Sequence, residues 1–439
     1  MQTLRLTLFL TLFFTALLNQ AYAFQLPLVD NSPVEKAKQI QKLIQDGEAE
    51  KLWPMLDSAS QAAISKDLLG MIWQQVEAQA GQFMGIKGHK IEQLQGLTIV
   101  VLNNQFANTW LDVKIGFNTA GKVAGFRFLP GEEPNKPLAN EATFFEAKHP
   151  VVNGTFTLDG RLTLPKNTES PPLVIMFQGS GPHNMDEAIG PNRIFEQVAH
   201  GLAQQGIATL RYHKRTYAYS TSMGDSLTIF TEGINDGIAA VRQITGNDSL
   251  QFSGIYLLGH SQGGMFIPSI AKACPQVKGL IMMAAVARPL QTLVVEQVNY
   301  FAARDSVTAE EQARIDLIEQ KAQVIDNKAY AGKEVSELLL NLPAGYWQSI
   351  DNTPWVTITK KLKKPVLVLQ GLRDCQVTMD DYMVWQKALK KKATYHQYPT
   401  LNHLFLPGQG PSYPDEYNQP GQIPEAFFTD ISSWLNSLK

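Results

Sequence analysis

Cysteine is scarce in this 439-residue chain, which contains only Cys274 and Cys375. The two lie far apart in the sequence, and neither belongs to a CxxC pair or to the spacing of a metal-ligand set. The sequence leaves open whether they pair, and we expect two separate, buried thiols. The cysteine pattern therefore gives no reason to expect a bound metal.

Net charge is also small, because 38 lysines and arginines stand against 40 aspartates and glutamates, for a formal charge of −2. A chain so balanced has no overall basic field to attract nucleic acid or an anionic membrane. We therefore expect no nucleic-acid partner and a compact, mostly neutral ligand. The sequence does not indicate an oligomeric state.

Long apolar runs are absent beyond the N-terminus. Arg5 precedes a mostly apolar run over residues 6–18, which is shorter than the roughly 20 residues that span a bilayer. Residues 21–23, Ala-Tyr-Ala, have the small-x-small pattern of a signal-peptidase site. We expect residues 1–23 to be a signal peptide and the mature chain to begin at Phe24, exported to the periplasm or secreted without a stable membrane anchor.

The chain is too long for one average domain, and its texture changes along its length. Residues 24–130 read as helices followed, after Gly96, by three antiparallel strands, which predicts a small α+β domain. Residues 131–146 are rich in proline and charge and read as a linker. In residues 147–439 strands and helices alternate, which predicts a mostly parallel sheet with helices on both faces, interrupted by a helical cap at about 288–363.

The motif GHSQGG, residues 259–264, follows a buried strand pattern and precedes a helix pattern. Ser261 on such a sharp turn projects its hydroxyl from the carboxyl end of the sheet, and the flanking glycines allow strand and helix to approach closely. We expect Ser261 to be a nucleophile and the amide of Gln262 to be an oxyanion donor. The alternative is a glycine-rich turn that merely contains a serine.

An acid and a histidine follow in the order that such a nucleophile requires. Asp374 lies in the loop after the strand pattern KPVLVLQG, and His403 lies in the loop after TYHQYP. Both loops are expected at the same edge of the sheet as Ser261, so His403 could act as base and Asp374 could orient it. The alternative acids are Asp380 and Asp381, which are expected in the next helix. The alternative histidines are His396, inside a predicted strand, and His260, beside the nucleophile.

A second oxyanion donor is expected in QGSGP, residues 178–182, the loop after the first central strand. Its glycines let the backbone approach a reacting carbonyl, and we assign the amide of Ser180, with Gly181 as the alternative.

Together these motifs, with GPN at 190–192 and LRYHKRT at 210–216, resemble the α/β-hydrolase superfamily over about residues 145–439. More narrowly they resemble exported bacterial esterase-like members that carry a small N-terminal domain of unknown function. The resemblance implies Ser261 as nucleophile, Asp374 as acid, His403 as base, and Ser180 and Gln262 as amide donors. One departure is Gln178, where many relatives have histidine.

The expected activity is hydrolysis of carboxylic esters with small or medium acyl groups through an acyl-enzyme, with no metal or organic cofactor. A peptidase or amidase with the same mechanism and a catalytically silent binding protein remain open. Arg288 could meet an anionic substrate group or form a surface salt bridge. Arg211 and Arg215 are expected to tie down a loop, and Leu339, Leu340 and Trp347 of the cap could line a pocket or simply pack.

Overall fold

The computed structural model describes residues 32–94, 96–131, 133, 138–219, 226–304 and 306–438. The expected signal peptide, its cleavage site before Phe24 and part of the expected linker lie outside these residues. Within the described ranges, none of the helices combines the length and the apolar character that a membrane crossing requires.

The N-terminal part packs four short helices on an antiparallel sheet. The helices are α1 (Pro33–Gln45), α2 (Ala49–Leu52), α3 (Ser58–Ala63) and α4 (Lys66–Ala80). Ser32 and Ser65 cap α1 and α4 by accepting backbone hydrogen bonds from Glu35 and Leu68. The strands, in the order 1-2-3-4, are β1 (Phe83–Leu94), β2 (Leu97–Phe106), β3 (Trp110–Phe117) and β4 (Val123–Pro130).

The strand β1 was not among the expected elements. Its sequence contains Gly85 and Gly88, and its pairing with β2 shifts register twice, near each of these glycines. Glycine weakens a strand pattern, so the local signal was lost although the pairing holds along the whole of β2.

The large sheet has eight strands in the order β16-β15-β14-β13-β9-β12-β8-β5. Its six parallel strands are β9 (Pro172–Phe177), β12 (Ala208–Tyr212), β13 (Gly254–His260), β14 (Val277–Met283), β15 (Val366–Gly371) and β16 (Ala393–Tyr398). The antiparallel strands β8 (Gly160–Pro165) and β5 (Phe144–Lys148) complete one edge. This sheet therefore begins inside the stretch expected to be a linker.

Helices cover both faces of this sheet. On one face lie α5 (Ile194–Gln204) and α14 (Glu425–Asn436), and on the other lie α7 (Asn235–Thr245), α8 (Gly263–Ala273) and α13 (Met379–Leu389). Strand β13 alternates between the two cores, since Leu257 belongs to one cluster and Leu258 to the other. The expected fold class, an α/β-hydrolase sheet behind a small α+β domain, is confirmed.

Smaller elements are β6 (Val151–Asn153), β7 (Phe156–Leu158), β10 (Ala188–Ile189), β11 (Asn192–Arg193), α6 (Arg215–Ala218) and the π-helical turn η3 (Phe230–Ile234).

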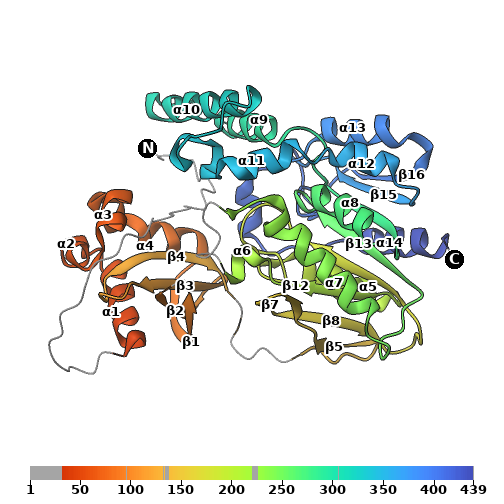
Figure 1. Ribbon diagram of the computed structural model, residues 1–439, viewed down its shortest axis with the longest axis horizontal. Helices are drawn as coiled ribbons and strands as arrows, with labels where there is room; N and C mark the ends of the chain where they lie inside the picture. The colour runs from red at the N-terminus through yellow and green to blue at the C-terminus, as the bar shows by residue number, and fades with distance from the viewer. Residues whose placement is uncertain are drawn as a thin grey trace.

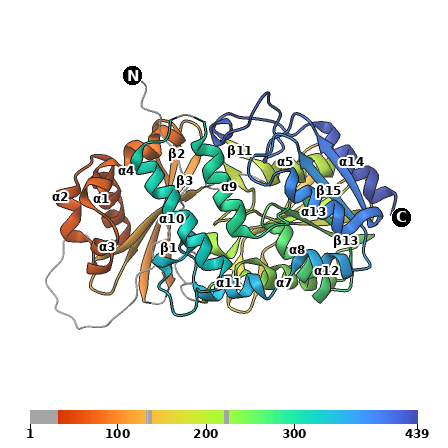
Figure 2. The ribbon, with the colours of Figure 1, turned by 90° about the horizontal axis from the view of Figure 1, so that it is seen from above.

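Between β14 and β15 the chain forms the cap, which consists of α9 (Leu290–Ala302), α10 (Ala309–Asp326), α11 (Ala344–Asp351) and α12 (Trp355–Lys361). The capping box of Thr308 and Glu311 begins α10. Figure 1 shows α9 and α10 at the top of the molecule, and Figure 2, seen from above, shows α10 on the side of the small domain.

The small domain sits at one end of the molecule and contacts α6 of the large one (Figure 1). The Lys114 ammonium donates to the carbonyl of Tyr217 at 3.2 Å, and the Tyr217 hydroxyl donates to Asp112 at 3.2 Å. Both charged side chains are buried, and burial lowers the pKa of Lys114 and raises that of Asp112. Polar groups buried together in this way hold the two domains in one arrangement.

Candidate active site

Ser261 occupies the turn that joins β13 to α8. Its φ of +53° is in the left-handed region, which is uncommon for a serine and marks a strained turn. The turn is held because the Ser261 amide donates to Met283 at 2.9 Å while its carbonyl accepts from Gly264 and Val286. A methyl group on Gly263 would collide with the carbonyl of Phe177, and one on Gly259 would lie 2.5 Å from the carbonyl oxygen of Gly263. Only glycine allows this approach.

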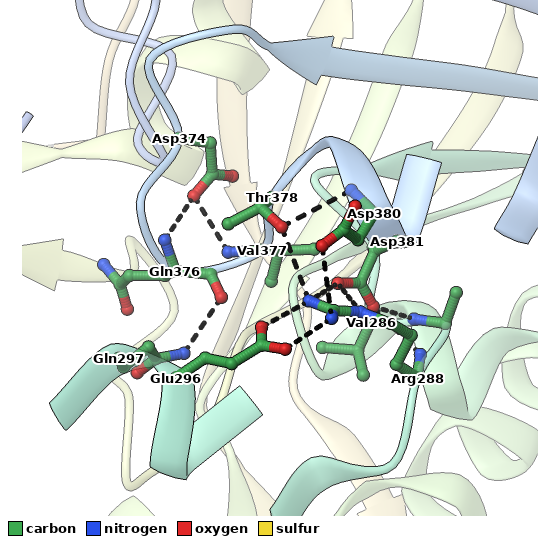
Figure 3. A network of polar contacts seen from close by, with 12 residues as sticks. Val286, Arg288, Glu296, Gln297, Asp374, Gln376, Val377, Thr378, Asp380 and Asp381 are labelled. Atoms are coloured by element: carbon green, nitrogen blue, oxygen red, sulfur yellow. Dashed lines mark hydrogen bonds and ion pairs between the residues drawn. The ribbon is translucent and has the colours of Figure 1, made fainter. Parts of the chain in front are cut away.

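Asp374 and His403 meet at the carboxyl ends of β15 and β16. Oδ2 of Asp374 lies 2.8 Å from Nδ1 of His403, and both side chains are buried. The other oxygen, Oδ1, accepts from the amides of Gln376 and Val377 at 2.8 and 2.9 Å (Figure 3). The carboxylate is therefore fixed on both sides, and it can hold the imidazole with Nδ1 protonated.

The competing acids have other partners. Asp381 accepts from the amides of Ala287 and Arg288 and from the Arg288 guanidinium, whereas Asp380 is exposed at the start of α13. His396 pairs with Asp430 at 3.2 Å. None of these residues is the partner of His403 in the structure.

His260 links the base loop to the nucleophile turn. Its ring lies 4.7 Å from the ring of His403, centroid to centroid, and its Nε2 lies 3.0 Å from the carbonyl oxygen of His403. Its Nδ1 lies 3.0 Å from Oε1 of the buried Glu187. Because His260 directly precedes Ser261, this contact brings the His403 loop to the serine.

The loop after β9 lies against the same turn. A Cβ built on Gly179 would be 3.2 Å from the Cβ of Ser261, so the peptide between Gly179 and Ser180 borders the serine. The Gly179 amide donates to Glu187 at 2.6 Å. Gln178, the departure from the family pattern, donates from its side chain to the carbonyls of Asn184 and Tyr212 and so anchors this loop.

Two comparisons with known proteins show the family to which this chain belongs. A family model described as "Serine aminopeptidase, S33" matches residues 191–408. Esterase EstD of Thermotoga maritima is 32% identical over 388 residues, which cover 87% of this chain and 90% of the relative. The chain belongs to the α/β-hydrolase superfamily. It is a hydrolase enzyme, and the resemblance read from its motifs is confirmed.

The N-terminal part of the hydrolase matches a second model, described as "Protein of unknown function (DUF3887)", over residues 37–126. Among solved structures, Est1E from Butyrivibrio proteoclasticus aligns with a TM-score of 0.42 at 18% identity, covering 66% of this chain and 98% of that one. A puromycin-hydrolyzing peptidase from Mycobacterium tuberculosis aligns with a TM-score of 0.44 at 14% identity, covering 80% and 46%.

The residues that hold the loops of the hydrolase were only partly visible in the sequence. Arg211 is fully buried and donates to Asp186 and Glu146, and Arg215 pairs with Asp236. Arg211 therefore ties the loop at Asp186 to the sheet, as expected, whereas Arg215 joins α6 to α7 and not to a loop. Lys214, between them in sequence, was not singled out, although it is buried beside the nucleophile turn. A buried cation inside a run of cations carries no local signal that separates it from its neighbours.

The cap residues considered for substrate contact mostly have structural partners. Arg288 forms a bidentate pair with Glu296 and also contacts Asp381, so the salt-bridge interpretation holds (Figure 3). Leu339 and Trp347 are buried in the larger core cluster, whereas Leu340 is exposed. The cap also contacts the acid loop, because Gln297 on α9 donates to the carbonyl of Gln376 at 3.0 Å (Figure 3). Both cysteines are free and buried, as expected.

Proposed function

We propose that this hydrolase cleaves carboxylic esters of small or medium acyl groups through an acyl-enzyme on Ser261. The observation that carries the proposal is the 2.8 Å contact between Nδ1 of His403 and Oδ2 of Asp374. The carbonyl of His403 also contacts His260, the residue directly before the strained turn at Ser261. This is the arrangement in which an imidazole can take the proton of a serine.

In the proposed reaction, Oγ of Ser261 attacks the ester carbonyl carbon while Nε2 of His403 accepts the hydroxyl proton. The electron pair of the carbonyl π bond moves to its oxygen, and the amides of Ser180 and Gln262 stabilise that oxyanion. Collapse of the intermediate breaks the bond to the alcohol, which takes the proton from His403. Water then repeats these steps on the acyl-enzyme and releases the acid.

Esters are favoured over peptides because of the charges near the serine. An aminopeptidase needs a carboxylate that is free to bind a substrate ammonium group. Two carboxylates near the turn are already engaged, since Glu187 accepts from Gly179 and contacts His260, and Glu232 pairs with Lys214. The name of the curated relative, an esterase, points the same way.

The test is covalent labelling of the purified protein with a fluorophosphonate, followed by rate measurements. We expect the wild type and the Ser249→Ala control, altered in an exposed loop, to be labelled. Ser261→Ala should be unlabelled and lose hydrolysis of p-nitrophenyl acetate to octanoate. Equal labelling of Ser261→Ala would overturn the nucleophile assignment, and faster cleavage of aminoacyl p-nitroanilides than of these esters would favour the peptidase.

We further propose that the chain is exported, with residues 1–23 as a signal peptide. N-terminal sequencing of the protein recovered from a bacterial periplasm or culture medium should begin at Phe24. Recovery only from the cytoplasm, with an intact N-terminus, would contradict the proposal.

A further inference from the structure

A buried lysine lies under both loops that border Ser261. Lys214 follows β12 and is 3% exposed. Its ammonium group lies 2.7 Å from the carbonyl oxygen of Gly179, 3.1 Å from Oε1 of Gln262 and 2.6 Å from Oε1 of Glu232. An ammonium group has three N–H donors, so all three are used inside the protein.

Tyr346, on cap helix α11, closes these contacts into a ring. Its hydroxyl donates to Oε2 of Glu232 and accepts from Nε2 of Gln262 at 2.6 Å. Burial and the Glu232 carboxylate raise the pKa of the Tyr346 phenol well above its usual range, so the phenol keeps its proton and remains a donor. In this ring both oxygens of Glu232 and both polar atoms of the Gln262 side chain are satisfied, which is the condition under which a buried network is rigid.

The ring controls the orientation of the peptide between Gly179 and Ser180. In a trans peptide the C=O and N–H bonds point in opposite directions, and the described residues contain no cis peptide. Lys214 holds the carbonyl of this peptide on one side, so the Ser180 N–H must point to the other. The N–H of Gly179, which belongs to the preceding peptide, donates to Glu187. The peptides on both sides of the Gly179 Cα are therefore held, and neither can rotate. A hydrogen bond to the carbonyl also polarises the peptide and strengthens its N–H as a donor.

We propose that Lys214 is a positioning residue for the oxyanion hole, and that Tyr346 connects the cap to the same hydrogen-bond network. The inference rests on the proposed function, because it assumes that Ser180 and Gln262 are the two amide donors. One cation touches both of these segments, through the Gly179 carbonyl and the Gln262 side chain. Lys214 itself does not touch substrate. It preorganises the donors, and such preorganisation acts on the transition state more than on the bound substrate.

The first test compares Lys214→Met with the wild type. Methionine retains the apolar stem and loses all three N–H donors, so kcat for a p-nitrophenyl ester should fall about 100-fold while KM changes little. The matched control is Lys364→Met, because Lys364 also donates to backbone carbonyls, those of Pro275 and Val277, at the amino end of the sheet. This control should retain wild-type kcat.

A transition-state mimic separates positioning from a general loss of structure. An aryl trifluoromethyl ketone forms a bond between Oγ of Ser261 and its carbonyl carbon, places the resulting oxyanion in the hole and passes the serine proton to His403. Its affinity for Lys214→Met should fall by the same factor as kcat, whereas the corresponding methyl ketone should bind as to the wild type. Unchanged kcat, or equal losses for both ketones, would overturn the inference.

Tyr346→Phe provides a second, milder test that is decisive if Lys214→Met does not fold. It removes one hydroxyl from the ring, and we expect kcat and trifluoromethyl ketone affinity to fall together about fivefold. No change in either would overturn the role of the cap. Failure of the proposed function is recognised separately, because the wild type would then escape fluorophosphonate labelling. A labelled, active wild type with an equally active Lys214→Met would refute this inference alone.

Discussion

Nδ1 of His403 lies 2.8 Å from Oδ2 of Asp374, while the opposite oxygen of the same carboxylate receives two backbone amides. The carboxylate therefore cannot turn away from the imidazole without breaking these three contacts and a fourth, from the side-chain amide of Gln370 at 3.4 Å. The His403 loop is fixed independently by Nε2 of His260. Asp374 and the His403 loop are thus held by different contacts. Asp374 can therefore be substituted without moving the His403 loop.

Asp374→Asn should lower kcat by about 10³-fold or more, because an amide that donates toward Nδ1 favours the wrong tautomer of His403. The protein should remain folded, with near-wild-type circular dichroism. The control is Asp380→Asn, six residues along on the exposed start of α13, which should retain full activity. Comparable losses in both variants would mean that the acid has been assigned wrongly.

Gly263→Ala should destabilise the fold and reduce activity together. The added methyl group has no room between the turn and the carbonyl oxygens of Phe177 and Gln178, so the free energy of unfolding should fall by about 3 kcal/mol. At Gly70, in the middle of α4, a methyl group would meet only the Gly47 carbonyl at 3.8 Å. Gly70→Ala should therefore be neutral or stabilising by about 0.5–1 kcal/mol. Urea unfolding of the two variants distinguishes these outcomes.

The features that could be predicted are those whose signal is local. The strand, turn and helix around Ser261 occupy one continuous stretch, and the positions of Asp374 and His403 follow from the loops that leave two consecutive strands, β15 and β16. The parallel sheet was recognisable from the alternation of apolar strands with amphipathic helices, whereas β1, with Gly85 and Gly88, lacked a clean pattern.

The features that could not be predicted are made by segments far apart in the chain. The ring of Lys214, Glu232, Gln262 and Tyr346 joins a loop after β12, a π-helical turn, the nucleophile turn and the cap. None of its members has a distinctive local context, and only the folded chain brings them together. Similarly, nothing local indicates that Glu187 adopts a φ of +46° and contacts both Gly179 and His260.

Arg211→Met should be severely destabilising although it is remote from the chemistry. The guanidinium bonds Asp186, Thr163 and Glu146, and removing it leaves two buried carboxylates without their main cation. Although burial opposes ionisation, the hydrogen bond from His200 and the charge of Arg211 hold the pKa of Glu146 well below its usual range. We expect a loss of about 3–5 kcal/mol in the free energy of unfolding.

The matched control for Arg211 is Arg314→Met, because Arg314 forms an exposed ion pair with Glu310 on α10. Such surface pairs contribute little, so thermal and urea unfolding should match those of the wild type. A loss of stability in Arg314→Met as large as that in Arg211→Met would mean that burial does not account for the effect at Arg211.

The pH dependence of stability provides the last prediction, through His260. Both of its ring nitrogens lie 3.0 Å from oxygens that accept hydrogen bonds, Oε1 of Glu187 and the carbonyl of His403, so the folded state favours the doubly protonated ring. Burial alone would lower the pKa of His260, but the Glu187 charge and these hydrogen bonds raise it. Because the pKa of His260 is raised in the folded state, the protonated ring adds its full stabilisation of the fold below the unfolded pKa, about 6.5. This stabilisation is lost as the pH rises through the folded pKa.

The stability advantage of the wild type over His260→Gln, measured by urea unfolding, should therefore shrink as the pH rises above about 6.5, the unfolded value. His149→Gln is the control with the opposite sign, because burial lowers the pKa of His149 and its folded form resists protonation. The wild type should gain stability relative to that variant as pH rises through about 6.5, the unfolded value. If the His260 difference stayed constant over this range, or grew with pH, the ring would be neutral in the folded state. The contact with the His403 carbonyl would then require a protonated Glu187, which the amide of Gly179 disfavours by donating to the same carboxylate.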